Sequence, residues 1–342
     1  MEETFKTEFL QICTLKNPNK NNIARFNYLI NFVDVNCIDK YGRTPLILLC
    51  VNNQSSSLIE LIKSLLYIGT WKHFIFQAIK TFNLQSKQQA NVNHVDSNGY
   101  TAFIYLCTNY QRKDLINIIK LFIENGVNLN YQDKYGFTGM RQLFCTTIKG
   151  NLLDILNLMI LNGFSPNLKD YQNRNLLHIF CEYCGFDNSN ETVDIIQKLL
   201  ESKIDVSDRT IYGKTALHFL CECYSFKDLA FVIQHLLDFD NTKTIINITD
   251  DAKNTALHYL CKKYINNSLI DVVELLVERE IDINAKDYYN KTALLLLCEE
   301  SNKIKNEKIN LDKVIKFLVK QGADVFALGE YKKYVDELTK ND

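Results

Sequence analysis

The 342-residue sequence has little proline, tryptophan or methionine, with three, one and three residues of these types. So little proline, together with a hydrophobic fraction of 46% and a charged fraction of 23%, is unlike the composition of a disordered chain. There is enough apolar material for a packed core, and we expect the chain to fold.

An excess of charge of either sign is also missing. The 39 Lys and Arg residues nearly balance the 40 Asp and Glu residues, which leaves a formal net charge of -1. Binding to a phosphate backbone relies on a broad positive field. The composition therefore argues against nucleic acid as a partner.

Long apolar runs are absent as well. No stretch reaches the roughly 18 uninterrupted apolar residues that a membrane-crossing helix needs. The first thirty residues carry Glu2, Glu3 and Glu8 and are unlike the basic start and apolar run of a signal peptide. We expect no membrane insertion, a mature protein that begins at Met1 and a cytoplasmic location, with the nucleus or the cytosol of a host cell as alternatives.

One twelve-residue segment occurs seven times, and a second apolar segment follows each copy. The copies are DKYGRTPLILLC (39–50), DSNGYTAFIYLC (96–107), DKYGFTGMRQLF (133–144), DYQNRNLLHIFC (170–181), TIYGKTALHFLC (210–221), DDAKNTALHYLC (250–261) and DYYNKTALLLLC (287–298). Successive threonines, or the residue in their place, are 57, 37, 37, 40, 40 and 37 residues apart. A fixed period of this length is typical of stacked repeats.

Each copy contains the local signals for a turn followed by a helix. Asp begins the turn in six of the seven copies. Gly42 or Asn173 supplies a residue that tolerates a left-handed backbone, whereas Lys253 breaks this rule. The threonine is expected to cap the helix through its hydroxyl, and Pro45 suits the first helical position. Each helix pair leaves apolar stripes that only neighbouring pairs can cover, so we expect the repeats to stack.

The segment resembles the ankyrin repeat, whose D-x-x-G-x-T-P-L-H signature opens a short helix that is followed by a longer helix and a G-x-D-x-N loop. The resemblance extends over nearly the whole chain and implies an all-α ankyrin-repeat solenoid of helix pairs joined by β-hairpin-like loops. The sequence departs from the family by writing Leu-Cys where two alanines are usual, and each copy is about four to seven residues longer than the common length of ~33.

The repeats divide the chain into three parts. Residues 1–38 lack the signature and are interpreted as an atypical N-terminal capping repeat, residues 39–330 as seven ankyrin-like repeats, and residues 331–342 as a short C-terminal closing helix. The long first spacing comes from an inserted amphipathic helix at about 68–90, in which Trp71 is followed by apolar residues at helical intervals. This helix is expected to pack onto the array, or alternatively to dock a partner.

Histidine and cysteine raise the question of a metal site or a catalytic pair. His178, Cys181 and Cys184 have a metal-like spacing, but the first two fall at positions that recur in the repeat, as His258 and Cys261 do. A periodic residue favours a packing role, so the cysteines are interpreted as reduced thiols. Phosphate-loop, HExxH and GxSxG motifs are also missing. We therefore expect no enzyme activity, no catalytic residue, no cofactor and no metal.

The resemblance implies a protein partner on the concave surface formed by the hairpin tips and short helices. Tyrosine and arginine often carry binding energy at interfaces. The alternative is that the tyrosines only pack against adjacent hairpins. The candidate binding residues are Tyr41, Arg43, Tyr100, Tyr135, Phe137, Tyr171, Arg174, Tyr212, Lys214, Tyr288, Tyr289 and Lys291.

The sequence therefore predicts a non-catalytic scaffold or adaptor that is a monomer by itself. Two alternatives stay open: an effector-type inhibitor of a host protein from a pathogen or virus, or a regulatory subunit of an enzyme on another chain. Asn36, Asn130 and Asn284 also resemble targets of asparaginyl hydroxylases, although asparagine is structural at that position as well.

Overall fold

The computed structural model describes residues 2–67, 89–146, 151–183, 189–223, 229–239, 245–263, 269–303 and 308–340. The chain divides into two compact units, Met1–Ser165 and Pro166–Asp342. The first unit contains α1 (Glu2–Cys13), α2 (Lys20–Leu29), α3 (Pro45–Asn52), α4 (Leu58–Leu66), α6 (Ala102–Asn109), α7 (Leu115–Glu124), α8 (Gly139–Cys145) and α9 (Leu152–Leu161). The second contains α10 (Leu176–Tyr183), α11 (Ser189–Glu201), α12 (Ala216–Cys223), α13 (Leu229–Phe239), η2 (Ile245–Asn247), α14 (Ala256–Lys263), α15 (Leu269–Glu278), α16 (Ala293–Lys303), α17 (Lys308–Lys320), η3 (Val325–Tyr331) and α18 (Lys332–Thr339).

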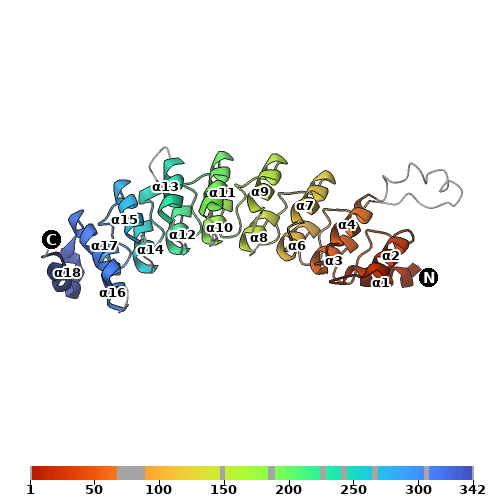
Figure 1. Ribbon diagram of the computed structural model, residues 1–342, viewed down its shortest axis with the longest axis horizontal. Helices are drawn as coiled ribbons and strands as arrows, with labels where there is room; N and C mark the ends of the chain where they lie inside the picture. The colour runs from red at the N-terminus through yellow and green to blue at the C-terminus, as the bar shows by residue number, and fades with distance from the viewer. Residues whose placement is uncertain are drawn as a thin grey trace. The chain divides into compact units, whose positions relative to one another are not determined.

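The predicted all-α repeat fold is confirmed. The described part of the chain forms helices and no strand, apart from an isolated bridge between Val95 and Thr101. In each unit, the first helices of successive pairs pack on one another, as α3 does on α6 and α12 on α14, and the second helices do the same, as α11 does on α13. Figure 1 shows these two rows of helices within each unit. Like elements therefore cover one another, which is how a repeat buries its apolar stripes.

In five of the seven copies, one aspartate side chain fixes the turn before the first helix, and in the copy that begins at Thr210 the threonine hydroxyl takes its place. In the first copy, Asp39 Oδ1 accepts hydrogen bonds from the main-chain N–H groups of Tyr41 (2.8 Å) and Arg43 (3.0 Å). The Asp39 N–H donates to the carbonyl of Arg43, and Gly42, with φ 72°, donates back to Asp39. Asp96, Asp133, Asp170 and Asp287 repeat the two Oδ1 contacts.

Lys253 completes its turn despite lacking the expected residue type. Its φ of 61° lies in the same left-handed region as that of Gly42 and Asn290. A residue other than glycine or asparagine is strained in this region of backbone conformation. The N–H of Asp250 donates to the carbonyl of Asn254 (2.9 Å) and that of Lys253 to the carbonyl of Asp250 (2.9 Å), so the hydrogen bonds of the turn hold the lysine in this geometry.

The helix caps follow two patterns. Thr44, Thr101, Thr138 and Thr292 accept a hydrogen bond from the third helical N–H, as expected of an N-cap residue. The hydroxyls of Thr215 and Thr255 differ from this expectation, because each lies 2.8 Å from the Nδ1 atom of the histidine three residues later. The histidine ring thus replaces the main-chain N–H as the partner of the hydroxyl.

The terminal segments also form helices. Residues 1–38 contain the pair α1 and α2, α2 begins with a capping box at Asn19, and α1 packs on α3. At the other end, α18 packs on α17, and the hydroxyl of Tyr334 donates to the carboxylate of Asp312. Residues 68–88 of the inserted helix predicted at about 68–90 lie outside the described residues.

Candidate partner-binding surface

The tips of the hairpins present tyrosine side chains to solvent. Six of the twelve candidate residues are exposed, by between 42% and 76% of their surface. They are Tyr41 and Tyr135 in the first unit, and Tyr171, Tyr212, Tyr288 and Tyr289 in the second. Ile211, which the sequence analysis missed, is 51% exposed beside Tyr212. Its place in the repeat, equivalent to that of Tyr171 and Tyr288, could have identified it.

Main-chain hydrogen bonds join consecutive hairpins in the second unit. Ile211 donates to the carbonyl of Gln172 (3.0 Å), Asp251 to that of Tyr212 (3.1 Å), and Tyr288 to that of Ala252 (2.9 Å). In the first unit, Ser97 donates to Tyr41 in the same way (3.1 Å). Because these bonds involve the main chain at the tips, they hold the tips of the second unit in a fixed row and join the first two tips of the first unit.

The other six candidates turn back onto their own chain. Arg174 is only 6% exposed and forms ion pairs with Asp170 (2.8 Å) and Glu182 (2.5 Å). Lys214 pairs with Glu222 (2.5 Å) and Lys291 with Glu299 (2.6 Å), in each case eight residues further along. These basic groups are half-buried or buried and already neutralised, so they are poorly placed to meet a partner.

Arg43 and the two remaining aromatic candidates of the first unit, Tyr100 and Phe137, also contact neighbouring side chains. Arg43 pairs with Asp39 (2.7 Å) and stacks against the ring of Tyr41. The guanidinium of Arg141 lies 3.6 Å from the ring centre of Phe137, and the half-buried ring of Tyr100 meets that of Tyr105 edge-on at 5.3 Å. The structure therefore separates the candidates into exposed tips and residues that support the hairpins.

Two lysines add positive charge beside the exposed rings of the first unit. Lys40 Nζ lies 4.9 Å from the ring centre of Tyr41, and Lys134 Nζ lies 5.0 Å from that of Tyr135. A cation over a ring face is attracted by the ring quadrupole. These tips can offer an aromatic face and an ammonium group to the same partner residue.

The histidines that resembled ligands form links between repeats. His178, His218 and His258 are each 1% exposed, and their Nε2 atoms lie 3.0–3.2 Å from the carbonyl oxygens of Asp208, Asn254 and Lys291, which lie just before or within the next hairpin. Burial lowers the pKa of His178 and of His218 to about 4. These rings are neutral at physiological pH and are occupied by structural hydrogen bonds.

The periodic cysteines lie in the core. Cys50, Cys107, Cys181, Cys221, Cys261 and Cys298 are all buried. Burial raises the pKa of Cys261 and of Cys298 to about 12, so these thiols stay protonated. Among the residues that the structure describes, no three His, Cys, Asp or Glu side chains gather as a metal site. Cys184 of the H-x-x-C-x-x-C motif lies outside them.

The loops after the second helices are joined by asparagine side chains. The amide of Asn130 donates to Gly163 O (2.8 Å) and accepts from Ser165 N–H (2.8 Å). Asn284 makes the equivalent pair with Gly322 and Asp324. Both ends of each amide are therefore used to connect one repeat to the next.

Paired helices that stack like with like, joined by hairpins with exposed tips, define a helical-repeat protein with a surface for recognition. Residues 225–328 match the family model described as ankyrin repeats, in three copies. The chain therefore contains ankyrin repeats, and the family predicted from the repeated segment is confirmed.

No curated protein matches the chain. Among solved structures, the chain is similar to one from the complex of a predatory endopeptidase of Bdellovibrio bacteriovorus with an immunity protein, with 20% identity and a TM-score of 0.47, over 63% of this chain and 98% of that one. The described helices include none that is long and apolar enough to span a membrane.

Proposed function

We propose that the protein is a non-catalytic scaffold or adaptor that binds a protein partner across its hairpin tips and the adjacent ends of its first helices. Ankyrin repeats are modules of protein–protein interaction, since their stacking creates an extended surface. The exposed tyrosines at the hairpin tips of each unit, most of them on hairpins joined by hydrogen bonds, are the observation that carries the proposal. Tyrosine gives large contact area at a low cost in conformational entropy, and a fixed row reduces that cost further.

The absence of catalysis is part of the proposal. Each candidate histidine has both ring nitrogens engaged, as His218 does with Thr215 and Asn254. The neighbouring Cys221 is buried, which raises the pKa of its thiol. A nucleophilic thiol needs a lowered pKa and access to substrate. The geometry of these pairs supports a structural role.

Affinity capture with a matched control tests the proposal. We would compare the unchanged chain with a variant in which Tyr135, Tyr212 and Tyr289 are replaced by alanine. We expect the captured partner to be lost, because truncating a few buried aromatic anchors removes most of the binding energy of a typical interface.

The control variant replaces apolar residues that are exposed on second helices, namely Leu161, Phe231 and Phe239. It should retain the partner. Circular dichroism checks that both variants keep their helices. Retention of every partner by the tyrosine variant, or equal loss in both variants, would exclude the hairpin tips as the specific binding surface.

A further inference from the structure

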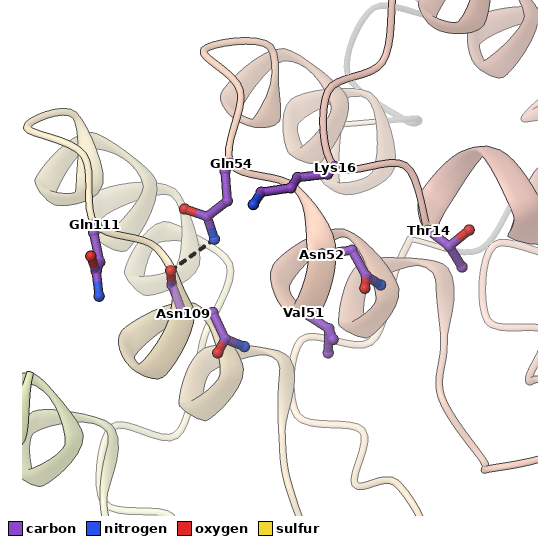
Figure 2. Close-up of a pocket in the computed structure, with 7 residues that line it drawn as sticks. All are labelled: Thr14, Lys16, Val51, Asn52, Gln54, Asn109 and Gln111. Carbon is purple, nitrogen blue, oxygen red and sulfur yellow. Dashed lines mark hydrogen bonds between the residues drawn. The ribbon is translucent and has the colours of Figure 1, made fainter.

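A polar hollow lies at the end of the first helices opposite to the hairpins. It has a volume of about 500 Å³ and is lined by Thr14, Lys16, Val51, Asn52, Gln54, Asn109 and Gln111 (Figure 2). These residues come from the C-terminal ends of α1, α3 and α6 and the segments that follow. Eight helical residues, at 1.5 Å per residue, place this hollow about 12 Å from the hairpin end of α3.

The amide residues of the hollow recur at equivalent positions of two repeats. Asn52 and Asn109 are 57 residues apart, as are Gln54 and Gln111, and the capping residues Thr44 and Thr101 have the same spacing. The pattern Asn-x-Gln thus begins at the last residue of the first helix in both repeats. Lys16 follows α1 at the corresponding edge of the N-terminal helix pair.

Hydrogen bonds from Gln54 hold the three segments together. Its main-chain N–H donates to Lys16 O (3.0 Å), and its side-chain Nε2 donates to Asn109 O (2.8 Å), as the dashed line in Figure 2 shows. The preceding residue, Asn53, is fully buried, and its Oδ1 accepts from the N–H of Ser55 (2.8 Å). The hollow is therefore formed in advance of any ligand.

The lining restricts the chemistry of a ligand. It contains four primary amides, one hydroxyl and one ammonium group, that of Lys16, and no carboxylate. Val51 is the one apolar lining residue, so a hydrophobic ligand would gain little. Asn52 Nδ2 already donates to Leu48 O (3.0 Å) and Gln54 Nε2 to Asn109 O. Each primary amide still has a second N–H group and a carbonyl oxygen, which match the alternating N–H and C=O groups of a peptide main chain.

The carbonyl groups and the ammonium group of the hollow favour different groups on the ligand. The last carbonyl groups of α3 and α6 lack intrahelical partners and favour N–H donors, although that of Asn109 already accepts from Gln54. The ammonium of Lys16 favours a carboxylate. A free anion supplies no N–H group, whereas an extended peptide with an acidic side chain supplies both.

We propose that this hollow binds an extended acidic segment of a protein, whose main chain pairs with the amides and whose carboxylate pairs with Lys16. The site is separate from the hairpin tips, so it can be tested without knowledge of the partner that the tips bind. It would give the first unit a second contact with the same partner, or a contact with another one.

The probe is a capped pentapeptide, acetyl-Gly-Ser-Glu-Ser-Gly-amide, compared with its glutamine counterpart. Binding to the full-length chain is followed through the NMR signals of side-chain amides. We expect saturable shifts at Asn109 and Gln111, and tighter binding of the acidic peptide. Lys16→Gln should reduce the affinity for the acidic peptide by up to about fivefold, to that of the neutral peptide, as expected for an exposed ion pair.

Two further variants complete the test. Gln111→Ala should weaken the binding of both peptides, because it removes a side-chain amide that pairs with the main chain of the peptide and leaves Lys16 in place. The matched control Lys120→Gln changes an exposed lysine on α7, away from the hollow, and should leave both affinities unchanged. A site with a millimolar dissociation constant would be nearly saturated at about 10 mM peptide. An absence of saturable shifts up to that concentration would therefore overturn the proposal. Equal binding after Lys16→Gln, or the same shifts with acetate alone, would also overturn it.

Discussion

The Nε2 atom of His218 lies 3.1 Å from the main-chain carbonyl oxygen of Asn254, in the next hairpin. On the other side of the ring, Nδ1 accepts a hydrogen bond from the N–H of Thr215 (3.0 Å). Nε2 must therefore carry the proton and Nδ1 must be free of one, which is the neutral form of the ring. His178 and His258 have the same arrangement.

This arrangement predicts a loss of stability in mild acid. The pKa of His178 and of His218 is lowered from 6.5 to about 4 by burial. These histidines take up protons below about pH 6.5 in the unfolded chain and only near pH 4 in the folded chain. The stability that the two neutral rings contribute is therefore complete above pH 6.5 and is lost as the pH falls toward 4. Lowering the pH from 7.5 to 5.0 should therefore reduce the free energy of unfolding by about 2 kcal/mol for each of these two histidines.

Urea unfolding at pH 7.5 and 5.0 measures this difference. His218→Gln should reduce the pH dependence, although the variant is less stable at pH 7.5. As a control, Gln234→Ala changes an exposed residue of α13 that does not titrate, and it should leave the pH dependence as it is. An identical pH dependence in all three proteins would contradict the structural role of the buried rings.

The left-handed backbone conformation of Lys253 predicts a substitution that stabilises the protein. The strain of φ 61° at Lys253 costs roughly 1–2 kcal/mol, part of which glycine would lose again in backbone entropy. Lys253→Gly should therefore stabilise the protein by about 0.5–1 kcal/mol. Lys262→Gly, within α14, should instead destabilise it by about 1 kcal/mol. Urea midpoints compare the two, and a midpoint that fails to rise in Lys253→Gly would show that the turn is not strained.

Glycine is predicted to be the one residue type that fits without strain at position 139. A Cβ atom there would lie 2.6 Å from Cε1 of Phe103 and 3.1 Å from Sγ of Cys107, and Phe103 is 2% exposed. Gly139→Ala should cost about 1–3 kcal/mol through overpacking. Adding Phe103→Leu should recover part of that loss in a double-mutant cycle. Additive effects of the two changes would mean that the contact with Phe103 is not the cause.

The thiols should differ sharply in reactivity. Cys223 is exposed, whereas Cys261 is buried with a pKa of about 12. At pH 8 such a thiol is ionised in about one molecule in ten thousand. Iodoacetamide should therefore modify Cys223 in the folded protein and reach Cys261 only after unfolding in urea. Rapid modification of Cys261 without urea, measured by mass spectrometry of peptides, would contradict its burial.

The helix pairs and hairpins could be predicted because their signals are local. The turn needs an aspartate at its start and a residue such as Gly42 near its end, and both are visible within six residues of sequence. The stacking partner of each helix follows from the repeat itself, since every copy exposes the same stripe.

The roles of the candidate binding residues were harder to predict, because they depend on contacts between residues at unequal distances. Position alone groups Lys214 with Tyr212, yet Lys214 is paired with Glu222 on the helix that follows. An acid eight residues after the basic residue occurs three times, after Arg174, Lys214 and Lys291, and this pattern was present in the sequence. The polar hollow required three segments to be placed together before its chemistry was apparent.

Hydrogen–deuterium exchange of the protein with and without its captured partner tests the central claim most directly. We expect exchange to slow at the hairpins around Tyr41, Tyr135, Tyr212 and Tyr289, since these tips would be covered in the complex. Slower exchange confined to the second helices α7, α9, α13 and α15, with the hairpins unchanged, would contradict the assignment of the partner to the hairpin surface.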